Sequence, residues 1–188
     1  MLRSGTEGRA RGELLLPMTD RIYNVLFLCT GNSARSILAE SILNRLGKGQ
    51  FRGFSAGSHP NGQVNPFALE LLKRLDFPTE GLRSKSWDEF TTPASPHFDF
   101  IITVCDNAAG ETCPTWLGKP TTAHWGIPDP AAFQGTDIEK KRAFNQAFKS
   151  LDTRIKLFLS LPIASLDQLR LKQELAAIGK AQLAESAP

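Results

Sequence analysis

The sequence predicts an α/β protein in which a sheet of parallel strands is flanked by helices on both faces. Nearly continuous apolar runs, which are typical of strands buried on both faces, alternate with segments whose apolar residues recur at helical spacing. This alternation is the pattern of strand–helix–strand units with parallel strands. The 188 residues, 41% of them hydrophobic and 22% charged, are sufficient for one globular domain.

The first half of the chain contains two expected strands and two expected helices. Residues 22–28 (IYNVLFL) and 51–58 (FRGFSAGS) have the composition of strands, and the second runs into a glycine turn. Between them, residues 36–46 (SILAESILNRL) have helical spacing. The segment NPFALELLKRLDF begins a second helix, with Asn65 as its N-cap and Pro66 at its first helical position.

The second half continues the alternation. Residues 99–105 (DFIITVC) are rich in β-branched residues and form the next expected strand. The proline-broken segment 118–133 is expected to be a loop with room for one short strand. A long helix is expected over residues 137–160, because its large apolar residues share one face. A further amphipathic helix is expected over residues 166–181.

Composition and charge argue against several classes of protein. No apolar run approaches the ~20 residues that a membrane span requires. The net charge of +3, with no basic block, gives no indication of a nucleic-acid partner. Three cysteines are an odd number and follow no secretory signal, so we expect a cytoplasmic protein with reduced thiols and without a membrane partner.

The junction between the first strand and the first helix has the chemistry of an anion-binding site. Cys29 ends the strand, small residues follow, and Arg35 stands where the helix begins. Free N–H groups at a helix N-terminus bind oxyanions, and a guanidinium can hold two oxygens of one anion. The residues expected to bind the oxyanion are Thr30, Gly31, Asn32, Ser33, Ala34 and Arg35.

The same junction is expected to make Cys29 a nucleophile. A thiol with an ordinary pKa of about 8.5 can fall to roughly 3.5–7.5 beside a helix N-terminus and cationic groups. We therefore expect a lowered pKa for Cys29, with a hydrogen bond from Ser36 to its sulfur. The alternative is a small buried apolar residue in a generic turn. The strand before the loop and the helix after it favour the catalytic interpretation.

The stretch VLFLCTGNSARSILAE resembles the phosphate-binding loop of the low-molecular-weight protein tyrosine phosphatase fold. It resembles more closely that of the arsenate reductases built on this fold. The segments FSAG, VNPFALELLKRL, ITVCD and HWGIPDPA continue the resemblance in the same order, over about residues 22–159. The resemblance implies a single three-layer domain with a central parallel four-stranded sheet flanked by helices. It covers neither the first 20 residues nor the last helix.

Three regions are expected on this basis. Residues 1–20 are expected to be a disordered N-terminal extension, and Met18 leaves open that translation begins there. Residues 21–160 are expected to form the phosphatase-like catalytic domain. Residues 161–188 are expected to form a C-terminal helical extension.

The resemblance also implies reduction of arsenate to arsenite through three thiols. Cys29 attacks arsenate, Cys105 resolves the thiol–arsenate adduct, and Cys113 takes over the disulfide and presents it to an external reductant. Cys29 and Cys105 each end an expected strand, so both are expected to face one crevice. The reductant implied is thioredoxin, with glutaredoxin or glutathione as alternatives, and no bound cofactor is expected. Cys105 and Cys113 as unrelated buried thiols, or in a zinc site of poor spacing, stay open as alternatives.

Two further sites follow from the resemblance. Asp129, which precedes a proline, matches the aspartate that protonates the leaving group in the phosphatases, although an Asp-Pro pair is also a common turn. Some reductases of this type hold a potassium ion at positions that match Asn32, Glu40 and Ser55. Lys85 stands where a carboxylate ligand is expected, so we predict that no metal binds and that the ammonium takes the ion's place. A solvated surface lysine is the alternative.

Two other functions stay open. A low-molecular-weight protein tyrosine phosphatase would hydrolyse phosphomonoesters through a cysteinyl-phosphate on Cys29. Ala34 occupies a position where many such phosphatases have a second cysteine, and the chain's one tyrosine, Tyr23, is not beside Asp129. A non-catalytic oxyanion-binding or redox-sensing module would use the same loop and cysteines.

Overall fold

The computed structural model describes residues 21–111 and 114–181. The expected N-terminal extension and Cys113 lie outside this part of the chain.

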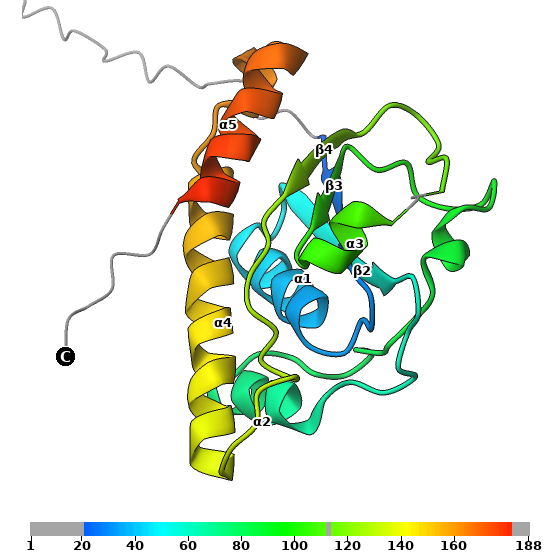
Figure 1. Cartoon of the computed structure of the whole chain (residues 1–188). Helices are drawn as coiled ribbons and strands as arrows, with labels where there is room; N and C mark the ends of the chain where they lie inside the picture. Colours follow the sequence, from blue (N-terminus) through cyan, green and yellow to red (C-terminus); the bar gives the residue numbers. More distant parts are fainter. Residues whose placement is uncertain (1–20, 112–113, 182–188) are drawn as a thin grey trace, which may run out of the picture.

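Four parallel strands form a single sheet, as predicted (Figure 1). They lie in the order β2-β1-β3-β4, and each pairing is parallel. The carboxyl ends of the strands therefore meet at one edge of the sheet, which is where α/β proteins bind ligands. The strands are β1 (Tyr23–Cys29), β2 (Phe51–Gly57), β3 (Phe100–Thr103) and β4 (Thr121–His124).

The four long helices that the sequence predicts are all present. They are α1 (Arg35–Leu46), α2 (Pro66–Arg74), α4 (Asp137–Leu159) and α5 (Gln168–Lys180). The Asn65 side chain accepts a hydrogen bond of 2.9 Å from the Phe67 N–H group, which confirms the expected cap of α2. The structure adds α3 (Asp106–Gly110) and two 3-10 helices, η1 (Trp87–Phe90) and η2 (Ile163–Ser165). These short elements were not predicted, because they span too few residues to show a helical period.

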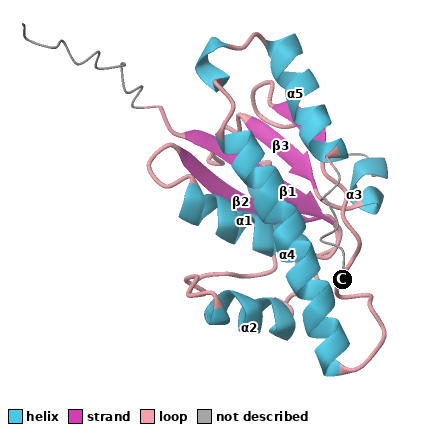
Figure 2. Ribbon diagram, turned by 90° about the vertical axis from the view of Figure 1, so that its left-hand side faces the viewer, coloured by secondary structure: helices cyan, strands magenta, loops and turns pink. Residues whose placement is uncertain are grey.

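The sheet separates two apolar clusters, and strand β1 contributes to both. Val25 and Phe27 point into the larger cluster, which the long helices cover, while Leu26 and Leu28 point into the smaller one. Figure 2 shows α4 crossing one face of the sheet. The other face differs from the expected helical layer, because η1 and the loops around it cover most of the smaller cluster. Continuous burial of β1 on both faces explains why its sequence is apolar throughout.

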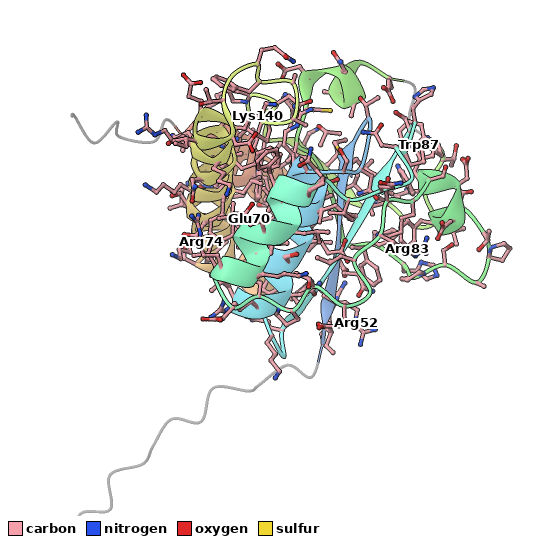
Figure 3. The ribbon with its side chains drawn as sticks, turned by 90° about the horizontal axis from the view of Figure 1, so that it is seen from below. Arg52, Glu70, Arg74, Arg83, Trp87 and Lys140 are labelled. Atoms are coloured by element: carbon pink, nitrogen blue, oxygen red, sulfur yellow. The ribbon has the colours of Figure 1, made fainter. Side chains whose placement is uncertain are left out.

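Polar side chains of helix α2 contact polar side chains of α4 at the surface. Glu70 lies 2.6 Å from the Lys141 ammonium, and the Arg74 guanidinium donates a hydrogen bond of 2.7 Å to the Asn145 side chain. In Figure 3, Glu70 and Arg74 project from α2 on the side of α4, whereas Trp87 lies on the other side of the sheet. These exposed contacts contribute at most about 1 kcal/mol each, and the buried Ala68, Leu71 and Leu72 anchor α2 in the larger cluster.

The last described helix, α5, is part of the main core. Leu171, Leu175 and Ile178 are buried in the larger cluster, and the Trp125 indole N–H donates a hydrogen bond of 3.0 Å to the Leu175 carbonyl oxygen. Within the described part of the chain, no helix is both long enough and apolar enough to cross a membrane.

Candidate active site

The loop that follows β1 turns beneath the N-terminus of α1. Cys29 is the last residue of β1 and is 3% exposed. Asn32 has a backbone φ of +41°, a left-handed conformation that asparagine tolerates better than most residues. The turn also passes close to β2, where a Cβ atom added to Gly57 would lie 2.4 Å from the Thr30 carbonyl oxygen. Glycine is therefore required at this position, which explains part of the FSAG segment.

Two hydrogen bonds contact the sulfur of Cys29. The Asn32 backbone N–H donates to this sulfur at 3.1 Å, and Ser36 Oγ shares a hydrogen bond of 2.9 Å with it. Burial nevertheless raises the pKa of the Cys29 thiol above its ordinary value, and these hydrogen bonds oppose the rise only in part. The expected lowering of this pKa is therefore wrong for the described structure, because the sequence pattern did not reveal how completely the thiol is desolvated.

Asn32 is the hub of a buried polar network. Its side-chain NH2 group donates to Ser36 Oγ at 2.8 Å and to Ser55 Oγ at 2.9 Å. Its side-chain oxygen accepts a hydrogen bond of 2.8 Å from the Lys85 backbone N–H. Every hydrogen-bonding atom of the amide is therefore used, which holds the loop in its left-handed turn.

The side-chain ammonium of Lys85 contacts the same network. The ammonium lies 3.4 Å from Ser55 Oγ and 3.6 Å from the Glu40 carboxylate, and the lysine is 9% exposed. Burial lowers the pKa of Lys85 below its ordinary value, and the nearby Glu40 carboxylate opposes this. The alternative of a solvated surface lysine is therefore wrong. The cation lies beside Ser55 and Glu40, two of the three positions at which the resemblance implies an ion.

Arg35 and Asp129 lie together at the mouth of the site. The Arg35 guanidinium donates to Asp129 Oδ2 at 2.8 Å and to the Ile127 carbonyl oxygen at 3.1 Å. The side chain of Arg35 is 14% exposed, so the contact is largely shielded from water. A guanidinium has five N–H groups, and three remain for an anion in the loop.

Cys105 lies at the carboxyl end of the neighbouring strand, as predicted. It is 2% exposed, caps α3, and accepts a weak hydrogen bond of 3.4 Å from the Ala108 N–H. Its sulfur lies 3.7 Å from the Thr30 hydroxyl, in the same loop that follows Cys29. The structure thus brings Cys29 and Cys105 to one edge of the sheet. Cys113 lies outside the described residues, and its place in the relay stays a prediction.

Two cavities meet above this edge of the sheet. One, of about 360 Å³, is lined by most of the loop, and its neighbour, of about 420 Å³, is lined by Cys105. Both cavities include Arg35, Asn107 and Asp129. The lining of the first cavity is Cys29, Thr30, Gly31, Ser33, Ala34, Arg35, His59, Asn61, Asn107, Asp129 and Ala131.

His59, Asn61 and Asn107 were not among the predicted site residues. The backbone N–H groups of His59 and Asn61 donate to the carbonyl oxygens of Thr30 and Gly31 at 3.0 and 2.9 Å. These two residues follow β2, and residues after a parallel strand face the same edge of the sheet as those after its neighbour. The position of the segment SHPN directly after the second expected strand could therefore have indicated that His59 and Asn61 lie at the site.

Comparison with known proteins places this geometry in a family. The family model described as low molecular weight phosphotyrosine protein phosphatase matches residues 24–174. The arsenate reductase of Oceanobacillus iheyensis is 33% identical over 134 residues, which are 71% of this chain and 93% of the relative. The arsenate reductase of Bacillus subtilis is 31% identical with the same coverage.

Solved structures show the same fold. The arsenate reductase from Archaeoglobus fulgidus matches with a TM-score of 0.60 at 26% identity, over 73% of this chain and 99% of the relative. The thioredoxin-dependent arsenate reductase of Corynebacterium glutamicum matches with a TM-score of 0.56 at 24% identity, over 77% of this chain and 64% of the relative. The chain therefore belongs to the low molecular weight phosphotyrosine protein phosphatase family, together with these arsenate reductases.

Proposed function

We propose that the protein reduces arsenate to arsenite, with Cys29 as the nucleophile and Cys105 as the thiol that resolves the adduct. The observation that carries the proposal is the position of a second thiol, Cys105, beside the loop that contains the first. A hydrolase of this family needs only one nucleophilic thiol, whereas a reductase needs further thiols to supply two electrons. The names of the curated relatives support the same activity.

Arsenate binds in the loop between β1 and α1. Backbone N–H groups at the start of α1 and the free N–H groups of Arg35 hold its oxygens, which places the arsenic atom in front of the Cys29 sulfur. Thr30, Gly31, Ser33 and Ala34 line this part of the cavity. Asn32 is 0% exposed. We therefore propose that its side chain shapes the loop and that only its backbone contributes to the oxyanion-binding site.

The first step forms a sulfur–arsenic bond. Because burial favours the protonated thiol, the Cys29 proton leaves as the sulfur attacks. It ends on the departing oxygen, so that Cys29–SH and HAsO4²⁻ give Cys29–S–AsO3²⁻ and water. Asp129, which lines the same cavity, takes up the Cys29 proton and passes it to the departing oxygen, while Ser36 steadies the sulfur through its hydrogen bond.

The second step transfers two electrons. The Cys105 thiolate attacks the Cys29 sulfur, the sulfur–sulfur bond forms, and the sulfur–arsenic bond breaks. Its electron pair stays with arsenic, which leaves as arsenite after taking up protons. Cys113 then attacks the Cys105 sulfur, which frees Cys29 and leaves a disulfide between Cys105 and Cys113.

An external thiol protein closes the cycle by reducing this disulfide. Thioredoxin is the proposed reductant, and glutaredoxin with glutathione is the alternative. The free thiols of Cys29 and Cys105 fit a reducing compartment, so we propose a cytoplasmic location. Lys85 supplies the positive charge next to the loop, and the proposed reaction uses no metal.

Phosphomonoester hydrolysis is a second candidate, because the family model is that of a phosphatase and Asp129 lies beside Arg35 at the mouth of the site. Tyr23, the one tyrosine of the sequence, is buried in the core against Phe51 and cannot bind an aryl ring at the site. We therefore propose hydrolysis as a residual activity of the loop.

The test is arsenate-dependent oxidation of NADPH with the thioredoxin system, repeated with glutaredoxin and glutathione, beside hydrolysis of p-nitrophenyl phosphate. Reduction must disappear in Cys29→Ser, Cys105→Ser and Cys113→Ser, and the reductant that supports turnover is thereby identified. Hydrolysis must disappear only in Cys29→Ser. Brisk hydrolysis without arsenate turnover would establish a phosphatase, and oxyanion binding without either reaction would establish a binding module.

A further inference from the structure

The carboxyl group of Glu111 lies beside the thiol that must attack. Thr30 Oγ1 donates a hydrogen bond of 3.3 Å to Glu111 Oε1, and the same hydroxyl lies 3.7 Å from the Cys105 sulfur. Thr30 therefore connects the thiol to the carboxylate. Because the hydroxyl uses its hydrogen toward Glu111, its lone pairs are free to accept the Cys105 S–H.

The other oxygen of this carboxyl is buried, and the described residues offer it no donor. Glu111 Oε2 has no hydrogen-bond partner among the described residues, and none of the ion pairs among them includes Glu111. A buried acceptor without a donor costs about 1–3 kcal/mol, and more when it is charged. Within residues 21–111 and 114–181, no ion pair accounts for this side chain, and its carboxylate is available to take up a proton.

Cys105 needs a proton acceptor because it lies in the core. It is 2% exposed, and the thiolate rather than the thiol attacks a sulfur atom. The contacts of its sulfur are the Ala108 N–H, which is a donor, and the Thr30 hydroxyl. Thr30 is thus the one of these two groups that can receive the proton.

We infer that Glu111 accepts, through the Thr30 hydroxyl, the proton that Cys105 loses when it attacks the Cys29 adduct. The Cys105 proton moves to Thr30 Oγ1 while the Thr30 proton moves to Glu111 Oε1. The thiolate then forms the sulfur–sulfur bond, the sulfur–arsenic bond breaks, and its electron pair reduces arsenic. Glu111 returns its proton to arsenite or water. This inference rests on the proposed arsenate reduction.

The first test measures arsenite release in a single turnover by the full, reduced chain without an external reductant. Glu111→Gln is expected to slow this release at least about tenfold near neutral pH, since general base catalysis contributes typically 10²–10⁴-fold. The rate of this variant should rise about tenfold per pH unit, because hydroxide then takes up the proton in place of the carboxylate. Glu111→Asp should restore part of the rate, and the exposed Glu80→Gln serves as the matched control.

The second test needs no arsenate. Cys105 lines a cavity, and mass spectrometry resolves the peptides in which iodoacetamide has alkylated Cys105 or Cys29. Glu111→Gln should slow the alkylation of Cys105 near neutral pH, because the thiol loses its proton acceptor, and leave that of Cys29 unchanged. If Glu111 only places a negative charge beside the thiol, its removal favours the thiolate, and the alkylation of Cys105 becomes faster instead.

The two tests separate the failure of this inference from that of the proposed function. Unchanged rates of arsenite release and of Cys105 alkylation in Glu111→Gln would overturn the role of Glu111 even if arsenite is formed. If the wild type releases no arsenite, the proposed function fails, and the alkylation rate still decides whether Glu111 accepts the Cys105 proton. Slower alkylation of Cys105 in Glu111→Gln supports that role, and an unchanged or faster rate overturns it.

Discussion

Replacement of Lys85 by methionine removes the buried cation and keeps the length of the side chain. The ammonium lies 3.6 Å from Glu40, and the two side chains are 8% and 16% exposed. At an effective dielectric constant of about 20, charges at this separation attract each other by about 4–5 kcal/mol. The cost of burying the ammonium, which also lowers the Lys85 pKa, offsets part of this attraction.

Lys85→Met is therefore expected to lower the free energy of unfolding by about 3 kcal/mol, because it leaves the Glu40 carboxylate without its cation. The double variant Lys85→Met/Glu40→Gln leaves neither charge unpaired, so it should recover about 2 kcal/mol of that loss. Urea denaturation, followed by circular dichroism, measures the free energy of unfolding of the wild type, of Lys85→Met, of Glu40→Gln and of the double variant. The four values can be compared if the m-value is unchanged.

Two results would refute this account of Lys85. One is a loss below about 0.5 kcal/mol in Lys85→Met, the usual range for a surface substitution. The other is additivity of the two single variants, since residues in one buried network should not add. Either result would mean that the ammonium contributes little to the network around Asn32.

Three further predictions concern the loop, its thiol and the last helix. Gly57→Ala places a Cβ atom against the Thr30 carbonyl oxygen, so arsenate turnover should fall at least about tenfold; unchanged kcat/KM would show that the loop adapts. Burial raises the Cys29 pKa, so its alkylation by iodoacetamide should increase with a midpoint above the ordinary thiol value of about 8.5. A midpoint near neutral pH would contradict that direction. Leu175→Ala should cost about 2–4 kcal/mol in urea denaturation, because Leu175 is 0% exposed in the main core; a loss near zero would indicate that α5 is a dispensable extension.

The strands and the long helices were predictable because their signals are local. The apolar run of β1 matches a strand that contributes to both clusters, and Asn65 with Pro66 marked the start of α2. The anion-binding loop was also predictable, since a cysteine, small residues and an arginine stand between a strand and a helix. These patterns depend on near neighbours in the chain, which a sequence displays directly.

The remaining features depend on contacts between distant segments. The raised pKa of Cys29 comes from burial by the assembled core, and the sequence suggested the opposite direction. Glu111 meets Thr30 across 81 positions of the chain, which no local pattern encodes. The cover of the smaller cluster by η1 was also missed, because it depends on which loops pack there.

In the proposed reaction, Cys29 and Cys105 reduce arsenate by forming a disulfide bond with each other. The most direct measurement mixes the reduced Cys113→Ser variant with arsenate, without any external reductant, and determines arsenite and disulfide-linked peptides by mass spectrometry. We expect one arsenite per chain and a disulfide between Cys29 and Cys105, which this variant cannot pass on to a third cysteine. Absence of arsenite, or arsenite formed while both thiols stay free, would contradict it.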